Sequence, residues 1–294
     1  METKNWNDAV FLVDANYIAY RGLYGLFQTT VTEIESAMFY GFMKTLVSIG
    51  KGVKVGKERV KSTNMILCWD SKHSYRKMLY PAYKRKPSNL SDHQEKILEA
   101  IRISFPRLRE WMNRINIPSY IYAGYEADDV IAAFTKQFGA KFIVITRDED
   151  LYQLLNRRVA IYKMVKKEKK LYTLGTFKDS YNITPNMWAR VKAVGGCTSD
   201  NIPGVSGIGE KTAIKYVASG QYETSTRQYR KIKGAQKEIN LFERLTRLPF
   251  DNKRFDTLSI EKKEPDWDAF TKFCQIYNFK SLIVKFKEVR NALS

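Results

Sequence analysis

Residues 125–134 read Tyr-Glu-Ala-Asp-Asp-Val-Ile-Ala-Ala-Phe, with carboxylates at Glu126, Asp128 and Asp129 and an apolar run directly after them. This pattern predicts the first turn of a packed helix, where unpaired N–H groups and a partial positive charge favour acidic side chains. Acidic first turns are common, so the stretch by itself does not indicate chemistry. It would indicate a functional site only if acidic residues from other parts of the chain lay next to it in the fold.

Three short apolar runs, at residues 9–13, 65–69 and 142–145, predict buried strands. Residues 34–49 carry apolar side chains at helical spacing, which predicts a packed helix between the first two strands. Near-continuous apolar strands that alternate with helices are typical of a mostly parallel sheet with helices on both faces. We therefore expect an α/β fold.

Acidic residues follow every one of these predicted strands. In parallel sheets, ligands bind at the carboxyl ends of the strands, so such acids should share one rim with the 125–134 helix. Each acid taken singly could instead cap the next helix. Eight carboxylates in one cleft need cations to neutralise them, and hard oxygen ligands indicate magnesium. The eight are Asp14, Asp70, Glu126, Asp128, Asp129, Asp148, Asp150 and Asp200.

The composition narrows the classes of function. The chain has 294 residues, of which 44 % are hydrophobic, and its 50 Lys plus Arg against 31 Asp plus Glu give a net charge of +19. A surplus of this size predicts a polyanionic partner, with nucleic acid ahead of an anionic membrane. No stretch approaches the length of a membrane-spanning helix, which weakens the membrane option.

Three widely spaced cysteines (Cys68, Cys197 and Cys274) cannot form a disulfide framework, and with two histidines a zinc site of the usual spacing is excluded. The N-terminus shows no signal-peptide pattern. We expect a cytoplasmic protein.

Residues 71–86 interleave basic side chains with three tyrosines and have poor apolar periodicity. Such a mixture suits a single-stranded nucleic acid, because bases stack on rings while Lys and Arg contact phosphates. The alternative is a solvated basic helix. The position directly after Asp70 favours the nucleic-acid role.

The sequence pattern changes after residue 158. Residues 159–162 and 171–174 flank the basic run 166–170 and predict a β-hairpin, and from about residue 176 the chain is mostly helical. Near the end, residues 265–277 predict an amphipathic helix and Ser281 is expected to cap another that reaches about residue 293. We interpret these last two helices as packing elements.

Residues 199–213 read Ser-Asp-Asn-Ile-Pro-Gly-Val-Ser-Gly-Ile-Gly-Glu-Lys-Thr-Ala and are the most specific stretch of the chain. The glycines predict a tight hairpin whose backbone can approach a phosphate, with the next helix directing its N-terminus there. They follow a helical segment and not a strand, which argues against a dinucleotide site. The stretch resembles the helix–hairpin–helix element that grips duplex backbones. Its candidate contacts are Gly204, Gly207, Gly209, Lys211 and Thr212.

From residue 10 to about residue 218 the chain resembles the 5′-nuclease superfamily. This superfamily contains the flap endonucleases and 5′–3′ exonucleases of bacteriophages and the 5′-nuclease domain of bacterial DNA polymerase I. With 294 residues the chain resembles the stand-alone phage enzymes most. Five motifs match in order, at residues 13–21, 69–84, 124–129, 146–150 and 199–204.

The resemblance implies a PIN-like α/β nuclease core at residues 1–175 with a helical arch at about 71–100. It implies a helical duplex-binding region at 176–294, with the helix–hairpin–helix at about 185–218. Two Mg²⁺ ions are implied, which Mn²⁺ could replace, and a K⁺ ion at the helix–hairpin–helix stays open. The first Mg²⁺ would be held by Asp14, Asp70, Glu126 and Asp128, with Asp129 nearby, and the second by Asp148, Asp150 and Asp200.

The same resemblance assigns roles to basic residues and one tyrosine. Two metal ions can generate a hydroxide and stabilise the leaving oxygen in an in-line attack on a phosphodiester. Lys84 and Arg85 would steady the charge that builds on the phosphate, and Lys84 occupies the catalytic lysine position of the family. The candidate DNA contacts in this part of the chain are Arg21, Arg76 and Tyr83.

The chain departs from the family pattern at several positions. Cys197 stands where the family usually has an acid, and a thiol is a poor magnesium ligand. Pro87 stands where an arginine is usual. Arg147 and Glu149 replace a small residue and a lysine around Asp148, and we have no account of what that changes.

The leading hypothesis is a 5′ nuclease of DNA replication or repair that cuts flaps and 5′ ends and leaves 5′-phosphates. Its partners would be DNA with 5′ flaps or 5′ ends and RNA–DNA hybrids, with no membrane, and we expect a monomer in the cytoplasm of a bacterial host cell. One alternative is a structure-specific DNA-binding protein in which Cys197 has weakened catalysis. Another is a ribonuclease of PIN type, against which Lys84 and the glycine-rich stretch argue. The balance of exonuclease and flap activity, and of DNA and RNA substrates, stays open.

Overall fold

The computed structural model describes residues 6–25, 33–55, 58–62, 64–85, 91–164, 169–220 and 226–294. Residues 166–168 of the predicted basic hairpin tip, and Pro87, lie outside these ranges. A six-stranded sheet has the order β5-β4-β1-β6-β7-β8, and the first five of these strands run parallel while β8 is antiparallel to β7. The strands are β1 (Val10–Asp14), β4 (Asn64–Cys68), β5 (Ser119–Tyr120), β6 (Phe142–Ile145), β7 (Val159–Met164) and β8 (Lys169–Tyr172).

The central strands are buried on both faces, as their near-continuous apolar sequences predict. In β1, Phe11 and Val13 point into one hydrophobic cluster, while Val10 and Leu12 point into the other. The prediction of a mostly parallel sheet with helices on both faces is therefore confirmed.

The first cluster packs helices from both ends of the chain against one face of the sheet. Helices α1 and α2 approach each other closely through two glycines: a Cβ on Gly22 would lie 2.7 Å from the backbone of Gly41. The helices of this face are α1 (Ala15–Gly25), α2 (Ile34–Gly50), α4 (Asp92–Arg114), α11 (Trp267–Ile276), α12 (Lys280–Val284) and α13 (Phe286–Leu293), and the small antiparallel pair β2 (Val53–Val55) and β3 (Glu58–Val60) lies beside them.

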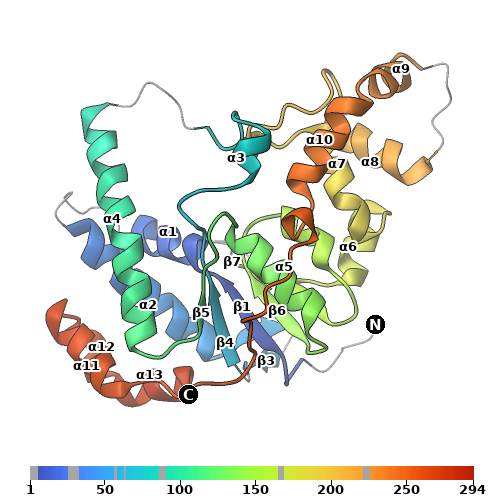
Figure 1. The fold of residues 1–294 in the computed structure, drawn as a ribbon. Coiled ribbons are helices and arrows are strands. Elements are labelled where there is room, and N and C mark those ends of the chain that lie inside the picture. The colour runs from blue at the N-terminus through green and yellow to red at the C-terminus, as the bar shows by residue number, and fades with distance from the viewer. Residues whose placement is uncertain are drawn as a thin grey trace.

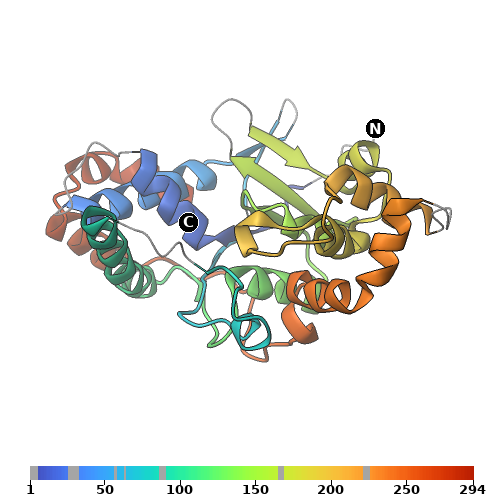
Figure 2. The same cartoon turned by 90° about the horizontal axis from the view of Figure 1, so that it is seen from above.

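The second cluster covers the opposite face with the middle of the chain. Figures 1 and 2 show this group on the far side of the sheet from α2, α4 and the C-terminal helices. Its main elements are α5 (Ala127–Gln137), the 3₁₀ turn η2 (Asp150–Leu154), α6 (Leu174–Tyr181), α7 (Trp188–Gly195), α8 (Glu210–Ser219), α9 (Arg227–Gly234) and α10 (Gln236–Thr246). Three further 3₁₀ turns are η3 (Pro185–Met187), η4 (Thr198–Asp200) and η5 (Phe250–Asn252).

Some local predictions differ from the structure. The single helix expected after Ser281 is instead two short helices: α12 ends at Val284 and α13 begins at Phe286. Ser281 lies inside α12 and does not cap it. Within the described residues 71–85, the basic stretch after Asp70 has one helix, the single turn α3 (Arg76–Leu79). The division of the chain near residue 175 and the duplex-binding role of residues 176–294 stay predictions.

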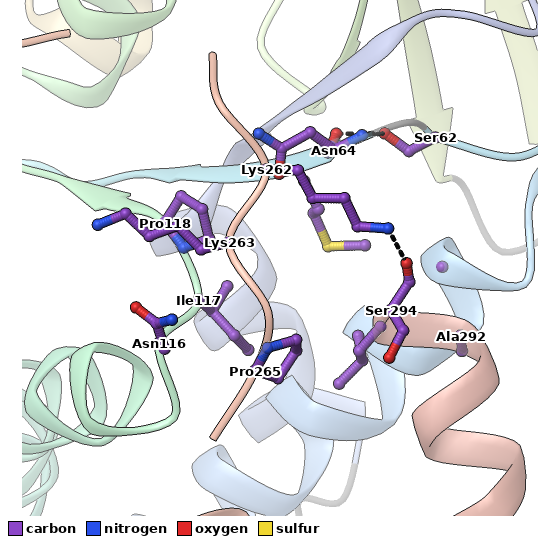
Figure 3. Close-up of a pocket in the computed structure, with 13 residues that line it drawn as sticks. Ser62, Asn64, Asn116, Ile117, Pro118, Lys262, Lys263, Pro265, Ala292 and Ser294 are labelled. Atoms are coloured by element: carbon purple, nitrogen blue, oxygen red, sulfur yellow. Dashed lines mark hydrogen bonds between the residues drawn. The ribbon is translucent and has the colours of Figure 1, made fainter. Parts of the chain in front are cut away.

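The C-terminal helices close a small cavity at the amino ends of the strands (Figure 3). Its volume is about 40 Å³, and it lies among Gly50, Asn64 and the last residues of the chain. Lys262 donates a hydrogen bond to the backbone oxygen of Ser294 across it. The cavity lies at the opposite end of the strands from the acidic residues and is too small for a substrate. No helix among the described residues has the length and apolar character that crossing a membrane requires.

Candidate active site

Three adjacent parallel strands place the predicted acids on one rim. Asp14 is the last residue of β1, Asp70 lies two residues past β4, and Asp148 and Asp150 follow β6. Strand β1 lies between β4 and β6, with Asp14 paired to Cys68 and Val13 paired to Ile145. The carboxyl ends of these strands therefore bring the four acids together, as the sequence predicts.

The carboxylate of Asp14 is fixed by two hydrogen bonds. Its Oδ1 accepts the N–H of Tyr17 at 3.0 Å, and its Oδ2 accepts the hydroxyl of Thr146 at 3.0 Å. The same hydroxyl oxygen accepts the N–H of Asp148 at 3.1 Å. Thr146 thus orients acids from two strands, a role that sequence reasoning missed although Thr146 directly follows the β6 run.

Asp70 connects the rim to the first turn of α5. Its Oδ1 accepts the N–H of Ala127 at 2.8 Å, and its own N–H donates to the side chain of Asn16 at 3.0 Å. The helix N-terminus offers this N–H because its first turn lacks backbone acceptors. The first turn of α5 therefore lies at the rim. Asn16 is a second supporting residue that sequence reasoning did not single out.

Glu126 is paired with the ammonium group of Lys84. Its Oε2 accepts the ammonium of Lys84 at 2.7 Å and the hydroxyl of Tyr83 at 3.1 Å. Burial alone would raise the pKa of this carboxyl, but Lys84 and Arg76 outweigh it and lower the pKa to about 2. Glu126 is therefore ionised throughout the physiological range.

Three predicted site residues have other roles than the ones assigned to them. Both guanidinium arms of Arg76 bind Asp129, at 2.6 and 2.7 Å, and the two residues are 2 % and 0 % exposed. Arg76 and Tyr83 are both 2 % exposed and do not present their side chains at the surface for contact with DNA, which differs from the role predicted for them. Asp129 is saturated by Arg76 and by the N–H groups of Glu126 and Phe250, so it is not free to bind a metal.

Lys84 sits where the segment after α3 meets η4. Its backbone has φ of +46°, an unusual conformation for a residue with a side chain, and its N–H donates to the carbonyl of Asp200 at 3.1 Å. Its Nζ lies 2.7 Å from Glu126 and 3.7 Å from Asp200. The side chain of Asn201 donates to the carbonyl of Arg85 at 2.9 Å, while the Arg85 side chain is exposed. Lys84 is therefore held between acids of both predicted metal positions.

A compact group of possible metal ligands lies beside η2 and η4. Among the described residues, the ligand atoms of Asp150, Cys197 and Asp200 all lie within 4.8 Å of one another. The thiol of Cys197 lies 3.9 Å from Asp150 Oδ2 and 3.1 Å from the hydroxyl of Ser199. Cys197, where the chain departs from the family pattern, therefore lies at the position predicted for the second metal.

The carboxylates repel one another strongly in the absence of a cation. Burial and the neighbouring Asp70 raise the pKa of Asp14 to about 7, and burial with Asp148 raises the pKa of Asp150 to about 8. Burial, followed by the charges of Asp148 and Asp14, raises the pKa of Asp128 well above its usual range. A divalent cation bound by these oxygens would remove the repulsion, so the donor set fits hard metal ions at the rim.

An open groove lies next to the rim, between α3 and α4. It has a volume of about 1100 Å³, and Asp70 forms part of its wall. The aromatic residues Tyr20, Trp69 and Phe105 are among those that line it. Cationic side chains line other parts of the wall: Lys72, Lys77, Arg102 and Arg109. The groove can hold a chain with alternating apolar and anionic parts.

The glycine-rich stretch connects two helices, α7 and α8. Gly204 has φ of +64°, and a Cβ there would lie 2.4 Å from the backbone N of Gly196, so only glycine allows the loop to fold back on the end of α7. Gly207 also has a positive φ, and Gly209 caps α8. Lys211 is exposed and Thr212 half-buried in the first turn of α8.

Arg21, another predicted DNA contact, lies in α1. Its guanidinium donates a hydrogen bond to the carbonyl of Met164 at 2.8 Å.

Comparison with known proteins places this geometry in a family. The model of the family "5′-3′ exonuclease, N-terminal resolvase-like domain" matches residues 9–182. The chain belongs to this family. The 5′-3′ exonuclease of Bacillus subtilis (strain 168) is 31 % identical over 231 residues, which cover 75 % of this chain and 73 % of that protein. The thermostable DNA polymerase I of Thermus filiformis is 29 % identical over 292 residues, which cover 94 % of this chain.

The chain spans 33 % of the length of that polymerase. Among solved structures, the bacteriophage T5 flap endonuclease, in a complex with DNA and metal ions, has a TM-score of 0.64 and 17 % identity, covering 96 % of this chain and 99 % of that chain. This likeness confirms the fold of the 5′-3′ exonuclease family, with its mixed, mostly parallel sheet. The resemblance to the 5′-nuclease superfamily is therefore confirmed.

Proposed function

We propose that this chain is a metal-dependent 5′ nuclease that hydrolyses phosphodiesters at 5′ flaps and 5′ ends and leaves 5′-phosphates. The observation that carries this proposal is the rim beside an open groove, where acids from three strands meet the first turn of α5 and Lys84 is paired with Glu126. Mutually repelling carboxylates with raised pKa values are costly to a fold that has no use for a bound cation. Membership of the 5′-3′ exonuclease family supports the same reaction.

The ligand roles proposed for the acids are those that the resemblance to the 5′-nuclease superfamily implies. Asp14, Asp70, Glu126 and Asp128 would hold a first Mg²⁺, and Asp148, Asp150 and Asp200 a second, with Mn²⁺ able to replace either. When bound, these ions supply a hydroxide at neutral pH and stabilise the leaving oxygen. Thr146 and Asn16 keep Asp14 and Asp70 in place through the hydrogen bonds described above.

Lys84 would stabilise the negative charge that develops on the phosphate. Its ammonium already lies between Glu126 and Asp200, so a phosphate that reaches the rim meets a fixed positive charge. The exposed Arg85, next in the chain, would add a second one. The pairing of Lys84 with Glu126 keeps the lysine protonated, because Glu126 raises the pKa of Lys84 well above its ordinary value although burial opposes this.

Substrate recognition would use two surfaces. The groove between α3 and α4 would take the unpaired strand, with bases against its aromatic side chains and phosphates against its cations. The loop from α7 to α8 would hold the duplex backbone at Gly207, Gly209, Lys211 and Thr212, as a helix–hairpin–helix at which a K⁺ ion can bind. Residues 176–294 would then be the duplex-binding part of the chain. RNA–DNA hybrids fit both surfaces as well.

One observation favours a second candidate, a DNA-binding protein with weak catalysis. Cys197 replaces an acid at the second metal position, where its thiol lies against Asp150. A panel of 5′-labelled substrates separates the two candidates: a 5′ flap duplex, a blunt duplex and a single strand, each incubated with Mg²⁺. The nuclease predicts cuts near the flap junction with 5′-phosphate ends. Shape-selective binding without cuts in Mg²⁺ or Mn²⁺ would favour the second candidate.

A further inference from the structure

The three side chains at the second metal position differ in chemical type. Asp150 and Asp200 offer carboxylate oxygens, while Cys197 offers a sulfur atom, and all three residues are buried with exposures of 8 %, 5 % and 8 %. Their ligand atoms lie within 4.8 Å of one another, so one ion can reach all three. The nearby hydroxyl of Ser199, 3.1 Å from the sulfur, is a further oxygen donor.

Among the described residues, the Asp150 carboxylate has few hydrogen-bond donors around it. Within the described part of the chain, its recorded hydrogen-bond contact is the thiol of Cys197 at 3.9 Å, which is a weak donor at long range. A buried carboxylate with so little hydrogen bonding costs the fold free energy unless a positive ligand neutralises it. Asp200, in contrast, is paired with the ammonium of Lys84 at 3.7 Å and the hydroxyl of Tyr83 at 3.4 Å.

The sulfur atom changes which cation suits this place. Mg²⁺ binds almost exclusively to oxygen and keeps several waters, whereas thiolate ligands select softer ions such as Zn²⁺. Co²⁺ and Cd²⁺ accept the same mixed sulfur and oxygen donors. A site with one thiolate and two carboxylates also carries enough negative charge to neutralise a divalent ion.

We propose that Asp150, Cys197 and Asp200 form a mixed thiolate–carboxylate site that binds Zn²⁺, Co²⁺ or Cd²⁺ in preference to Mg²⁺. The inference rests on the proposed function, because it specifies the ion for the second metal position of that nuclease. Binding forms a bond between Sγ and the metal, and the thiol proton leaves to solvent. The Mg²⁺ requirement for cleavage then belongs mainly to the first metal position, and thiophilic ions at low concentration change the activity by occupying the second.

Cobalt chloride titrated into the metal-free full-length chain tests this directly. A Co²⁺–thiolate bond gives a charge-transfer absorption in the near ultraviolet, which carboxylate ligands do not. We expect this band in the wild type, with saturation at one equivalent that a large excess of Mg²⁺ does not reverse. Cys197→Ser should lose the band and weaken Co²⁺ binding at this site by at least about 10- to 100-fold, since even residues outside the ligand set have effects of this size.

Two further variants complete the experiment. Cys274→Ser, in a buried cysteine of α11 on the other hydrophobic cluster, should keep the band. Cys197→Asp should lose the band and lower the Mg²⁺ concentration needed to saturate flap cleavage, because it restores an oxygen donor. Thermal unfolding of each metal-free variant checks that the fold is intact.

The outcomes separate this inference from the proposed function. Co²⁺ that binds to wild type without a thiolate band, or a band that survives in Cys197→Ser, overturns the mixed site. Flap cleavage in Mg²⁺ can be present in either case, and its presence would leave the nuclease assignment standing. A Cys197-dependent band in a protein that cuts no substrate would instead support the site and overturn the nuclease.

Discussion

Arg76 and Asp129 form a buried ion pair in which both guanidinium arms reach one carboxylate, with Nη1–Oδ2 at 2.6 Å and Nη2–Oδ1 at 2.7 Å. The pair joins three segments that are far apart in the sequence. Arg76 Nε donates to the carbonyl of Leu245 in α10, and Asp129 accepts the N–H of Phe250 in η5. Asp129 also accepts the N–H of Glu126, so the pair positions a carboxylate of the rim. Its role is to position the site, since neither residue faces the groove.

We predict that Arg76→Met lowers the free energy of unfolding by about 3–5 kcal/mol, because it leaves the Asp129 carboxylate buried without its partner. Urea unfolding followed by circular dichroism measures this. Arg244→Met is the matched control: Arg244 also donates two hydrogen bonds to one carboxylate, from Nε and Nη2 to Asp251 at 2.8 Å each, but on the surface. The control should change stability little, since water replaces the lost partner. Equal losses in the two variants would contradict the assigned role of burial.

The crowded carboxylates predict an unusual pH dependence for the metal-free protein. The folded pKa values of Asp14 (about 7) and Asp150 (about 8) lie above the ordinary aspartate value, so the folded state binds more protons than the unfolded state between about pH 4 and pH 8. Stability should therefore fall as pH rises through this window, at up to about 1.4 kcal/mol per pH unit for each group. The carboxyl of Glu126, with its pKa of about 2, makes stability rise with pH, but only below about pH 4.5.

Thermal unfolding in EDTA from pH 5 to pH 8 checks this expectation, and Mg²⁺ should raise the melting temperature more at pH 8 than at pH 5. The matched variant is Asp14→Asn, which removes one of the carboxyl groups with a raised pKa and should make the EDTA profile less steep. A melting temperature that rises steadily from pH 5 to pH 8 without metal would show that the carboxyl groups are not crowded in the way the structure indicates.

Lys84→Ala should reduce the rate of flap cleavage by about 10²–10³-fold, the usual effect of removing one charge-stabilising donor from a reaction centre. Binding to the flap duplex should change much less, because Lys84 is one cation among many on a chain of charge +19. Single-turnover rates and binding curves for the same substrate give both quantities. Lys280→Ala, in the exposed first turn of α12, is the control and should match the wild type in both.

The first turn of α8 gives a prediction about salt. If Lys211 contacts one phosphate of the duplex, Lys211→Ala should reduce the slope of log affinity against log salt by about 0.9, the share of one neutralised phosphate. The cut position should not move, since this contact reads no sequence. Binding of a flap duplex in EDTA at several salt concentrations measures the slope. An unchanged slope would remove α8 from the duplex contact, whatever the cleavage rate.

Sequence periodicity was sufficient to predict β1, β4 and β6 and the position of the acids, because each of these buried strands is short and an acid lies at its end or a few residues beyond it. The short strand β5 was not predicted. The β6 prediction, residues 142–145, matches the observed strand residue for residue. What periodicity cannot show is which charged side chains pair inside the protein. Arg76 lies in a basic stretch whose composition is typical of an exposed segment. It is buried because the tertiary fold brings Asp129, Leu245 and Phe250 to it.

The same limit explains the supporting residues. Thr146 and Asn16 are short polar residues next to the strand-end acids, and their hydrogen bonds depend on side-chain directions that spacing alone does not specify. Cys197, in contrast, could be singled out from the sequence, because it departs from the family pattern. The structure shows that its sulfur lies beside Asp150.

The central claim is that the acidic rim holds the metal ions of a 5′ nuclease, and Asp70→Asn tests it most directly. Asp70 lies on the rim and on the wall of the groove, and its replacement keeps the side-chain oxygen that accepts the N–H of Ala127. The measurement compares wild type and Asp70→Asn on a 5′-labelled flap duplex in Mg²⁺, with binding followed on the same substrate. The account predicts junction cleavage by the wild type, no detectable cleavage by the variant, and nearly equal binding. Cleavage by Asp70→Asn at the rate of the wild type would contradict it.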